Sequence, residues 1–135
     1  MARIGAVIVS VGSLAGLIGC QTTVPNYPGD HLYVANCSSC HGIFGEGDGP
    51  VSAVLSVPMR DLRYLAASNG GAFPRELVAK IIDGRELRVA HGRRQMPVWG
   101  EEFLFMEGFD AAAEERVSAK INALVDYLEA IQLSE

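Results

Sequence analysis

The sequence predicts an all-α fold, with one small domain behind an N-terminal targeting segment. Toward the C-terminus, apolar residues recur at spacings of 4, 3, 4 and 3, the period of one helix face: Val117, Ile121, Leu124, Leu128 and Ile131. Residues 74–84 form a shorter helical pattern, and the Gly- and Pro-rich sequence over 42–50 supplies no βαβ unit. The 135 residues less a targeting segment of 19 leave 116, which suits one domain but not two.

Residues 1–19 have the pattern of a signal sequence. Arg3 supplies one positive charge, and the run from Ile4 to Ile18 is apolar without an ionisable residue. As a helix this run spans roughly 22 Å, short of a hydrocarbon core of about 30 Å. A permanent transmembrane helix is therefore the less favoured interpretation.

The end of this segment, Leu17-Ile18-Gly19-Cys20, resembles the bacterial lipobox, in which a small residue precedes a lipid-bearing cysteine. The resemblance implies cleavage before Cys20, lipidation of Cys20 and a lipid-anchored linker over residues 20–28. An ordinary signal peptide with a stray cysteine, or an uncleaved anchor, remains open. Either alternative still places the following domain, residues 29–135, outside the cytoplasm.

The stretch Cys37-Ser38-Ser39-Cys40-His41 is the main chemical motif of the chain. Positions i and i+3 share one face of a helical turn, so Cys37 and Cys40 can both reach the vinyl edges of one porphyrin. His41 then follows as the proximal iron ligand. The motif predicts one covalently attached haem c.

A cysteine pair has two other common uses in proteins. A thioredoxin-like redox pair belongs in a βαβ setting, and a zinc site needs four ligands at ribbon-like spacings. The chain has three cysteines, and Cys20 is assigned to the lipid anchor. Haem attachment is the interpretation that remains.

The residues that lead into this motif are compatible with a short helix. Gly29, Leu32-Tyr33 and the run from Cys37 to Gly42 together resemble the N-terminal helix of class I monohaem cytochromes c. The resemblance extends over about residues 29–133 and implies that the first and last helices cross. Gly29 and Tyr33 would then meet Leu124, Tyr127 and Leu128.

The loop over 42–50 carries four glycines and cannot be regular structure. In the family that the chain resembles, a proline after this loop offers its carbonyl to Nδ1 of the proximal histidine. Pro50 matches that position, and a simple Gly-Pro turn is the alternative.

Three further segments follow this loop. Residues 51–65 read as an irregular connection and Asn69-Gly70-Gly71 as a break. A helix from Pro74 to just before Gly84 is expected to cover one haem face. The last helix is expected to start at Asp110, a favourable N-cap residue.

Met96 is the predicted distal iron ligand. It precedes Pro97, which favours an extended loop from which a thioether can point at the iron. The run Met96-Pro97-Val98-Trp99-Gly100 also resembles the distal-methionine loop of class I cytochromes c. Three other ligands remain open, with His31 expected on the surface: Met59, Met106 and His91.

Charge is unevenly distributed. Residues 101–135 hold nine acids and two bases, residues 60–100 hold four acids and eight bases, and the formal net charge is −5. Nucleic acid is therefore excluded as a partner. Arg60 or Arg63 could pair with haem propionates. A basic docking rim is the second use of the basic segment, formed by Arg85, Arg88, Arg93 and Arg94.

These patterns predict a lipid-anchored periplasmic carrier of single electrons, with haem c iron as its cofactor and redox proteins as donor and acceptor. No nucleophile–base constellation or carboxylate pair stands out, so an enzyme is not expected. The principal alternative is a haem subunit held permanently in a membrane oxidoreductase. A sensor or peroxidase-like protein with a displaceable sixth ligand is the third possibility.

Overall fold

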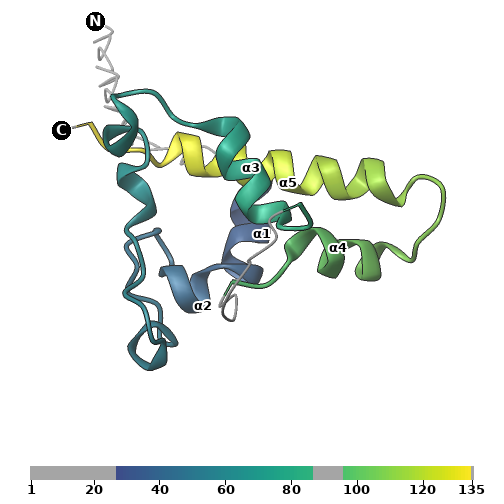
Figure 1. Cartoon of the computed structure of the whole chain (residues 1–135), viewed down its shortest axis with the longest axis horizontal. Helices are drawn as coiled ribbons and strands as arrows, with labels where there is room; N and C mark the ends of the chain where they lie inside the picture. Colours follow the sequence, from purple (N-terminus) through teal and green to yellow (C-terminus); the bar gives the residue numbers. More distant parts are fainter. Residues whose placement is uncertain (1–26, 87–95, 135) are drawn as a thin grey trace, which may run out of the picture.

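The computed structural model describes residues 27–86 and 96–134, and all regular secondary structure in these ranges is helical (Figure 1). The helices are α1 (Pro28–Asn36), α2 (Ser38–His41), α3 (Arg75–Asp83), α4 (Trp99–Glu107) and α5 (Ala113–Ala130), with short 3-10 turns at Ser52–Val54, Leu62–Tyr64 and Ala67–Asn69. The predicted all-α fold is confirmed. None of the described helices is long and apolar enough to span a bilayer. The predicted signal sequence and Cys20 lie outside the described residues.

The crossing of α1 over α5 forms the centre of the core, as predicted. Tyr33 and Leu124 are each 1% exposed, and the Tyr33 ring packs against Tyr127 with 4.9 Å between centroids. Gly29 makes the close approach possible. A Cβ atom at this position would overlap the carbonyl oxygen of Ala123 and lie 3.0 Å from Cβ of Tyr127.

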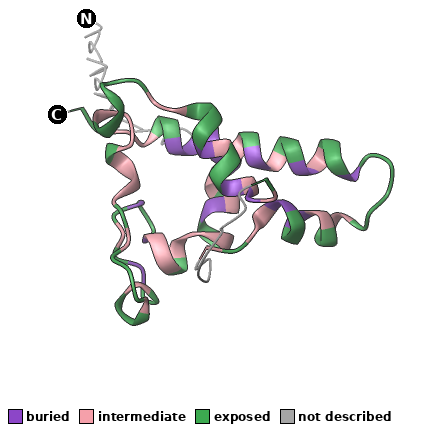
Figure 2. Ribbon diagram, viewed as in Figure 1, coloured by how far each residue is buried: buried purple, intermediate pink, exposed green. Residues whose placement is uncertain are grey.

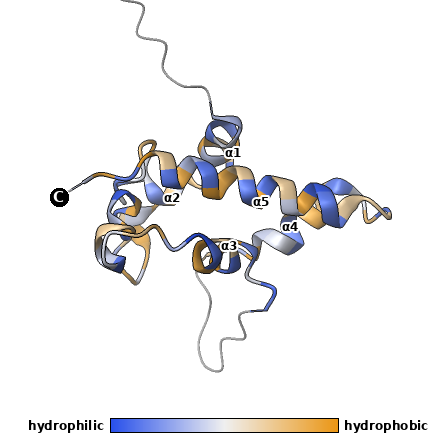
Figure 3. Ribbon diagram, turned by 90° about the horizontal axis from the view of Figure 1, so that it is seen from above, coloured by the Kyte–Doolittle hydropathy of each residue, from blue (hydrophilic) through white to orange (hydrophobic). Residues whose placement is uncertain are grey.

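Helices α3 and α4 also pack on α5. Val78 and Ile82 of α3 and Phe103 of α4 are buried in one cluster with Val117 and Ile121 of α5. Figure 2 shows the buried positions concentrated where the other helices face α5, and Figure 3 shows α5 running between α1 and α3. Leu77 and Ile81, the other apolar residues of α3, are exposed.

Helix α4 was not predicted, because residues 96–100 resemble a loop in the sequence. Its boundaries nevertheless carry ordinary signals, with Glu101 and Glu102 in the first turn and Gly108 at φ 87° as the C-cap. Helix α5 starts three residues after the predicted Asp110. The Asp110 carboxylate accepts a hydrogen bond from the backbone N–H of Ala112 at 2.8 Å, so it caps the turn that precedes the helix.

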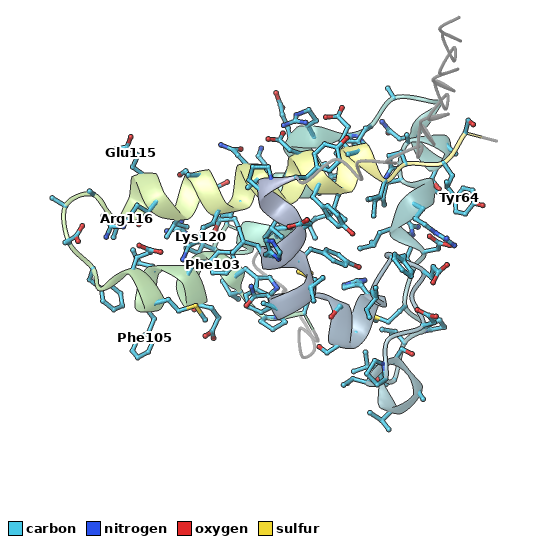
Figure 4. The ribbon with its side chains drawn as sticks, turned by 180° about the vertical axis from the view of Figure 1, so that it is seen from behind. Tyr64, Phe103, Phe105, Glu115, Arg116 and Lys120 are labelled. Carbon is cyan, nitrogen blue, oxygen red and sulfur yellow. The ribbon has the colours of Figure 1, made fainter. Side chains whose placement is uncertain are left out.

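A cluster of charges joins α4 to α5. The Glu107 carboxylate pairs with both Arg116 and Lys120, which lowers its pKa through the hydrogen bonds that these two cations donate. Lys120 Nζ also lies 5.5 Å from the centroid of the Phe103 ring. Figure 4 shows Phe103 and Lys120 between the two helices, whereas Phe105 projects from the opposite side of α4.

Replacing Gly29 by alanine should destabilise the fold by about 1–3 kcal/mol, because the added methyl group has no space against α5. Thermal unfolding of the haem-loaded protein measures this effect. Val34→Ala is the matched control, since Val34 lies on the same helix but is half exposed. Equal melting temperatures for Gly29→Ala and wild type would contradict the close packing at this crossing.

Candidate functional site

The Cys-x-x-Cys-His motif forms a tight helical turn directly after α1. The backbone N–H of His41 donates to the Cys37 carbonyl at 2.9 Å, and that of Cys40 donates to the same carbonyl at 3.2 Å. Side chains attach this turn to α1, since Ser38 Oγ donates to the Val34 carbonyl at 2.7 Å. The three motif side chains therefore project from a single turn, as the sequence predicts.

These side chains line a cavity of about 370 Å³ between α1, α2, the segment around Met59 and the start of α4. Met96 lies on the same cavity, so the structure brings all four predicted haem residues together. The remaining lining is mostly apolar and includes Ala35, Leu55, Pro97 and Trp99.

The other candidate iron ligands differ in whether they lie on this cavity. Met59 also lines the cavity, whereas Met106 is exposed on α4 and takes no part in it. His91 lies outside the described residues, and His31 is exposed as predicted. Trp99 lines the cavity as well and was not predicted to do so. Its place three positions after Met96, at the first position of α4, was the available signal.

Helix α3 does not cover the cavity. Its side chains pack on α5 and α4 and contribute nothing to the lining, which corrects the expectation that it covers one haem face. The apolar residues Val78 and Ile82, on which that expectation rested, belong to the helical core.

The Cys37 thiol differs from the reactive thiol of a redox-active pair. Burial, followed by the nearby Cys40, raises the pKa of the Cys37 thiol to about 12. A reactive dithiol needs the opposite, a pKa near or below ambient pH. A zinc centre is not indicated either, since no group of three or more His, Cys, Asp or Glu side chains in the described ranges could hold a metal ion.

His41 is placed to act as a ligand. Burial lowers the pKa of its imidazole, which favours the neutral form that binds iron. Its Nδ1 atom is buried without a hydrogen-bond partner in the described part of the chain. Two thiols, a neutral imidazole and thioether sulfurs around an apolar cavity form a donor set that fits a c-type haem.

The expected hydrogen bond between His41 Nδ1 and the Pro50 carbonyl is not formed. Pro50 is exposed, and the loop is attached instead to the backbone of α2, where the N–H of Val51 donates to the Ser39 carbonyl at 2.9 Å. The loop is nevertheless close to the motif. A Cβ atom on Gly49 would lie 2.5 Å from the Ser39 carbonyl oxygen.

Tyr33 connects this loop to the helical core. Its hydroxyl group donates to the carbonyl of Gly42 at 2.9 Å, and the bond is buried. Gly42 itself adopts φ 81°, a left-handed conformation that glycine tolerates and that turns the chain away after His41. The position of the motif turn is therefore fixed from both sides.

Two of the arginines expected near the cofactor are already paired. Arg63 binds Asp61 at 2.7 Å and Glu46 at 2.8 Å, which leaves Arg60 as the better candidate for a propionate partner. Arg85 binds Asp83 at 2.7 Å and Glu114 at 2.9 Å, so it is not a free member of a docking rim. The other expected rim residues, Arg88, Arg93 and Arg94, lie outside the described residues.

A helical fold whose Cys-x-x-Cys-His turn faces an apolar cavity is the arrangement of a c-type cytochrome domain. Comparison of the chain with protein families agrees, since the family model for cytochrome c oxidase, cbb3-type, subunit III matches residues 26–114. The chain belongs to this family. No curated protein and no solved structure matches it. Membership establishes covalently bound haem c and its iron as the cofactor, and electron transfer as the activity.

Gly49→Ala should lower both the haem content and the melting temperature, because the added methyl group would push the loop away from the backbone of residues 38–40. Haem content is measured by the absorbance of the reduced pyridine complex. Ser68→Ala is the control, since Ser68 is exposed in a different turn and its replacement brings no atom near α2. Similar haem content in the two variants would argue against crowding at α2 as the cause.

Proposed function

We propose that Cys37 and Cys40 attach one haem c, with His41 as the proximal and Met96 as the distal iron ligand, and that the protein relays single electrons on the periplasmic side of a bacterial membrane. The observation that carries this proposal is the cavity on which all four side chains meet. The bound haem supplies an iron that cycles between Fe(III) and Fe(II).

The residues of the chain have separate tasks in this scheme. The two thiols hold the cofactor covalently, and the neutral His41 imidazole offers a nitrogen to the metal. The apolar lining, Leu55 and Trp99 among it, excludes water from the site and favours the less charged reduced state. If His41 and Met96 both hold the iron, substrates would have no access to it, which would suit an electron carrier rather than a peroxidase-like protein or a sensor.

The anchor belongs to the same proposal. We assign residues 1–19 to a cleaved signal sequence, Cys20 to lipidation and residues 20–28 to the linker. Eight residues separate Cys20 from Gly29, and even a fully extended linker reaches only about 26–29 Å. The domain, residues 29–135, would then stay near the membrane, where confinement raises its effective concentration for a membrane-bound partner.

A second candidate is a haem subunit held permanently in a membrane oxidase. The description of the matching family, an oxidase subunit III, favours it. Purification of the untagged protein from native membranes separates the two functions. Stoichiometric co-elution with the same chains through successive columns indicates a subunit, and elution alone indicates a carrier with exchangeable donor and acceptor.

Met96→Ala should lower the reduction potential and allow carbon monoxide or cyanide to bind, because the sixth iron position loses its thioether. Met59→Ala is the matched control, since Met59 lines the same cavity but is not assigned to the iron. Absorption spectra and a redox titration of both haem-loaded variants provide the measurement. If Met59→Ala opened the iron and Met96→Ala did not, the distal ligand would be Met59.

Cys20→Ser should abolish lipidation, and a version with a cleavable secretory signal should release a cytochrome with a normal spectrum. We expect the released form to keep its potential but to support slower turnover with native membranes, because its local concentration falls. Mass spectrometry and membrane turnover assays test this. A wild-type protein that is already released, or turnover that is indifferent to release, would refute the anchor while leaving the cytochrome assignment intact.

A further inference from the structure

The outward side of α4 carries two adjacent aromatic rings that the core does not use. Phe105 is 73% exposed and Phe109 is 64% exposed, and their rings meet edge to face with 6.3 Å between centroids. With Glu101, Glu102 and Leu104 they line an open hollow of about 540 Å³. We call these five residues the α4 outer surface. A single exposed apolar side chain is ordinary, but a contiguous aromatic pair is typical of an interaction site.

The backbone conformation of Phe109 supports the interpretation of this aromatic pair as an interaction site. Phe109 adopts φ 58° directly after Gly108 at φ 87°, and it is the one non-glycine residue with positive φ in the described ranges. A left-handed conformation is unfavourable for a bulky residue and persists only where the surrounding structure imposes it. Here it places the Phe109 ring against Phe105 at the surface, while the buried core includes neither ring.

The charges beside the two aromatic rings indicate which class of molecule could bind there. Glu101 and Glu102 are exposed and form no ion pair with any described residue. By contrast, Glu107 and Asp110 at the other end of α4 are paired with Arg116 and Lys120. Of these four acids, the two without an ion pair to a described residue therefore lie beside the aromatic rings. A second copy of this chain would bring like charges together there, and anionic lipid would be repelled.

We infer that the α4 outer surface docks a basic protein partner, whose apolar pocket receives Phe105 and Phe109 and whose lysine or arginine side chains meet Glu101 and Glu102. Aromatic anchors with a charged border are the usual composition of such contacts, and a cation can also stack on an exposed ring. The surface is separate from the haem cavity, to which α4 contributes Trp99 at its first position. A partner bound here would leave the cavity residues uncovered, which suits a lasting contact in either a carrier or a subunit.

The test uses the haem-loaded full-length chain in a neutral detergent and a synthetic helical peptide of leucine and lysine as the probe. Calorimetric titration should show binding that falls at least tenfold in Phe105→Ser and in the double variant Glu101→Gln, Glu102→Gln. Two matched controls, Tyr64→Ser and Glu115→Gln, should keep the wild-type affinity. Both controls are exposed, and Figure 4 shows Tyr64 at the other end of the molecule and Glu115 on the far side of α5. A peptide of leucine and glutamate should not bind.

Several outcomes would overturn this inference. Equal loss of affinity in the controls, or equal binding of the glutamate peptide, would show a non-specific contact. Self-association that Phe105→Ser abolishes in sedimentation would assign the surface to a second copy. Phe105-dependent flotation of the Cys20→Ser chain with phosphatidylglycerol vesicles would assign it to lipid. Tighter peptide binding in Arg93→Gln, Arg94→Gln would assign it to the chain's own basic segment, residues 87–95.

Discussion

The close approach of α1 to α5 at Gly29 is the constraint on which the rest of the structure depends. Because no side chain separates the helices there, Tyr33 reaches deep enough to pack against Tyr127 and still donate its hydroxyl proton to the Gly42 carbonyl. One side chain thereby connects the helix crossing to the residue that follows the Cys-x-x-Cys-His turn. The packing of α1 on α5 therefore helps to set the orientation of the Cys-x-x-Cys-His turn.

The two parts of the domain are stabilised differently. The helical part buries its apolar residues along α5, from Val117 to Leu128. In the loop segment 43–61 no hydrophobic side chain is buried, and several lie exposed: Ile43, Phe44, Val51, Val54 and Val57. Within residues 43–61, Leu55 and Met59 line the haem cavity, and the five exposed residues do not. A haem in this cavity would therefore add apolar contacts to the loop segment through Leu55 and Met59.

The features that could be predicted from the sequence are those encoded by short-range patterns. The Cys37-to-His41 motif, the Pro74 and Gly84 boundaries of α3 and the 4-3-4-3 stripe of α5 each predict their structure from a few residues. Helix α4 escaped notice because its apolar residues do not keep to one face. Phe103 points into the core and Phe105 into solvent.

Long-range contacts explain the remaining differences between sequence and structure. Arg63 and Arg85 each pair with an acid from a distant segment of the chain. The 42–50 loop is attached to Ser39 rather than to His41 by a backbone path that composition does not specify. The position of Met96 on the cavity beside the Cys-x-x-Cys-His motif is likewise a long-range contact. The Met96-Pro97 sequence indicated only that Met96 lies in a loop, and the family resemblance supplied its expected place beside the motif.

Most of the described arginines form ion pairs with carboxylates, which reduces the positive charge that the surface exposes. Of the described arginines, Arg63, Arg75, Arg85 and Arg116 all lie against carboxylates, which leaves Arg60 as the exception. Three of the eight bases in residues 60–100 are thus held in ion pairs, namely Arg63, Arg75 and Arg85, while the formal net charge of the chain is −5. Within a screening length of about 8 Å, an anionic headgroup layer repels such a surface. If the proposed lipid anchor is present, its short linker would hold the domain near the bilayer against this repulsion.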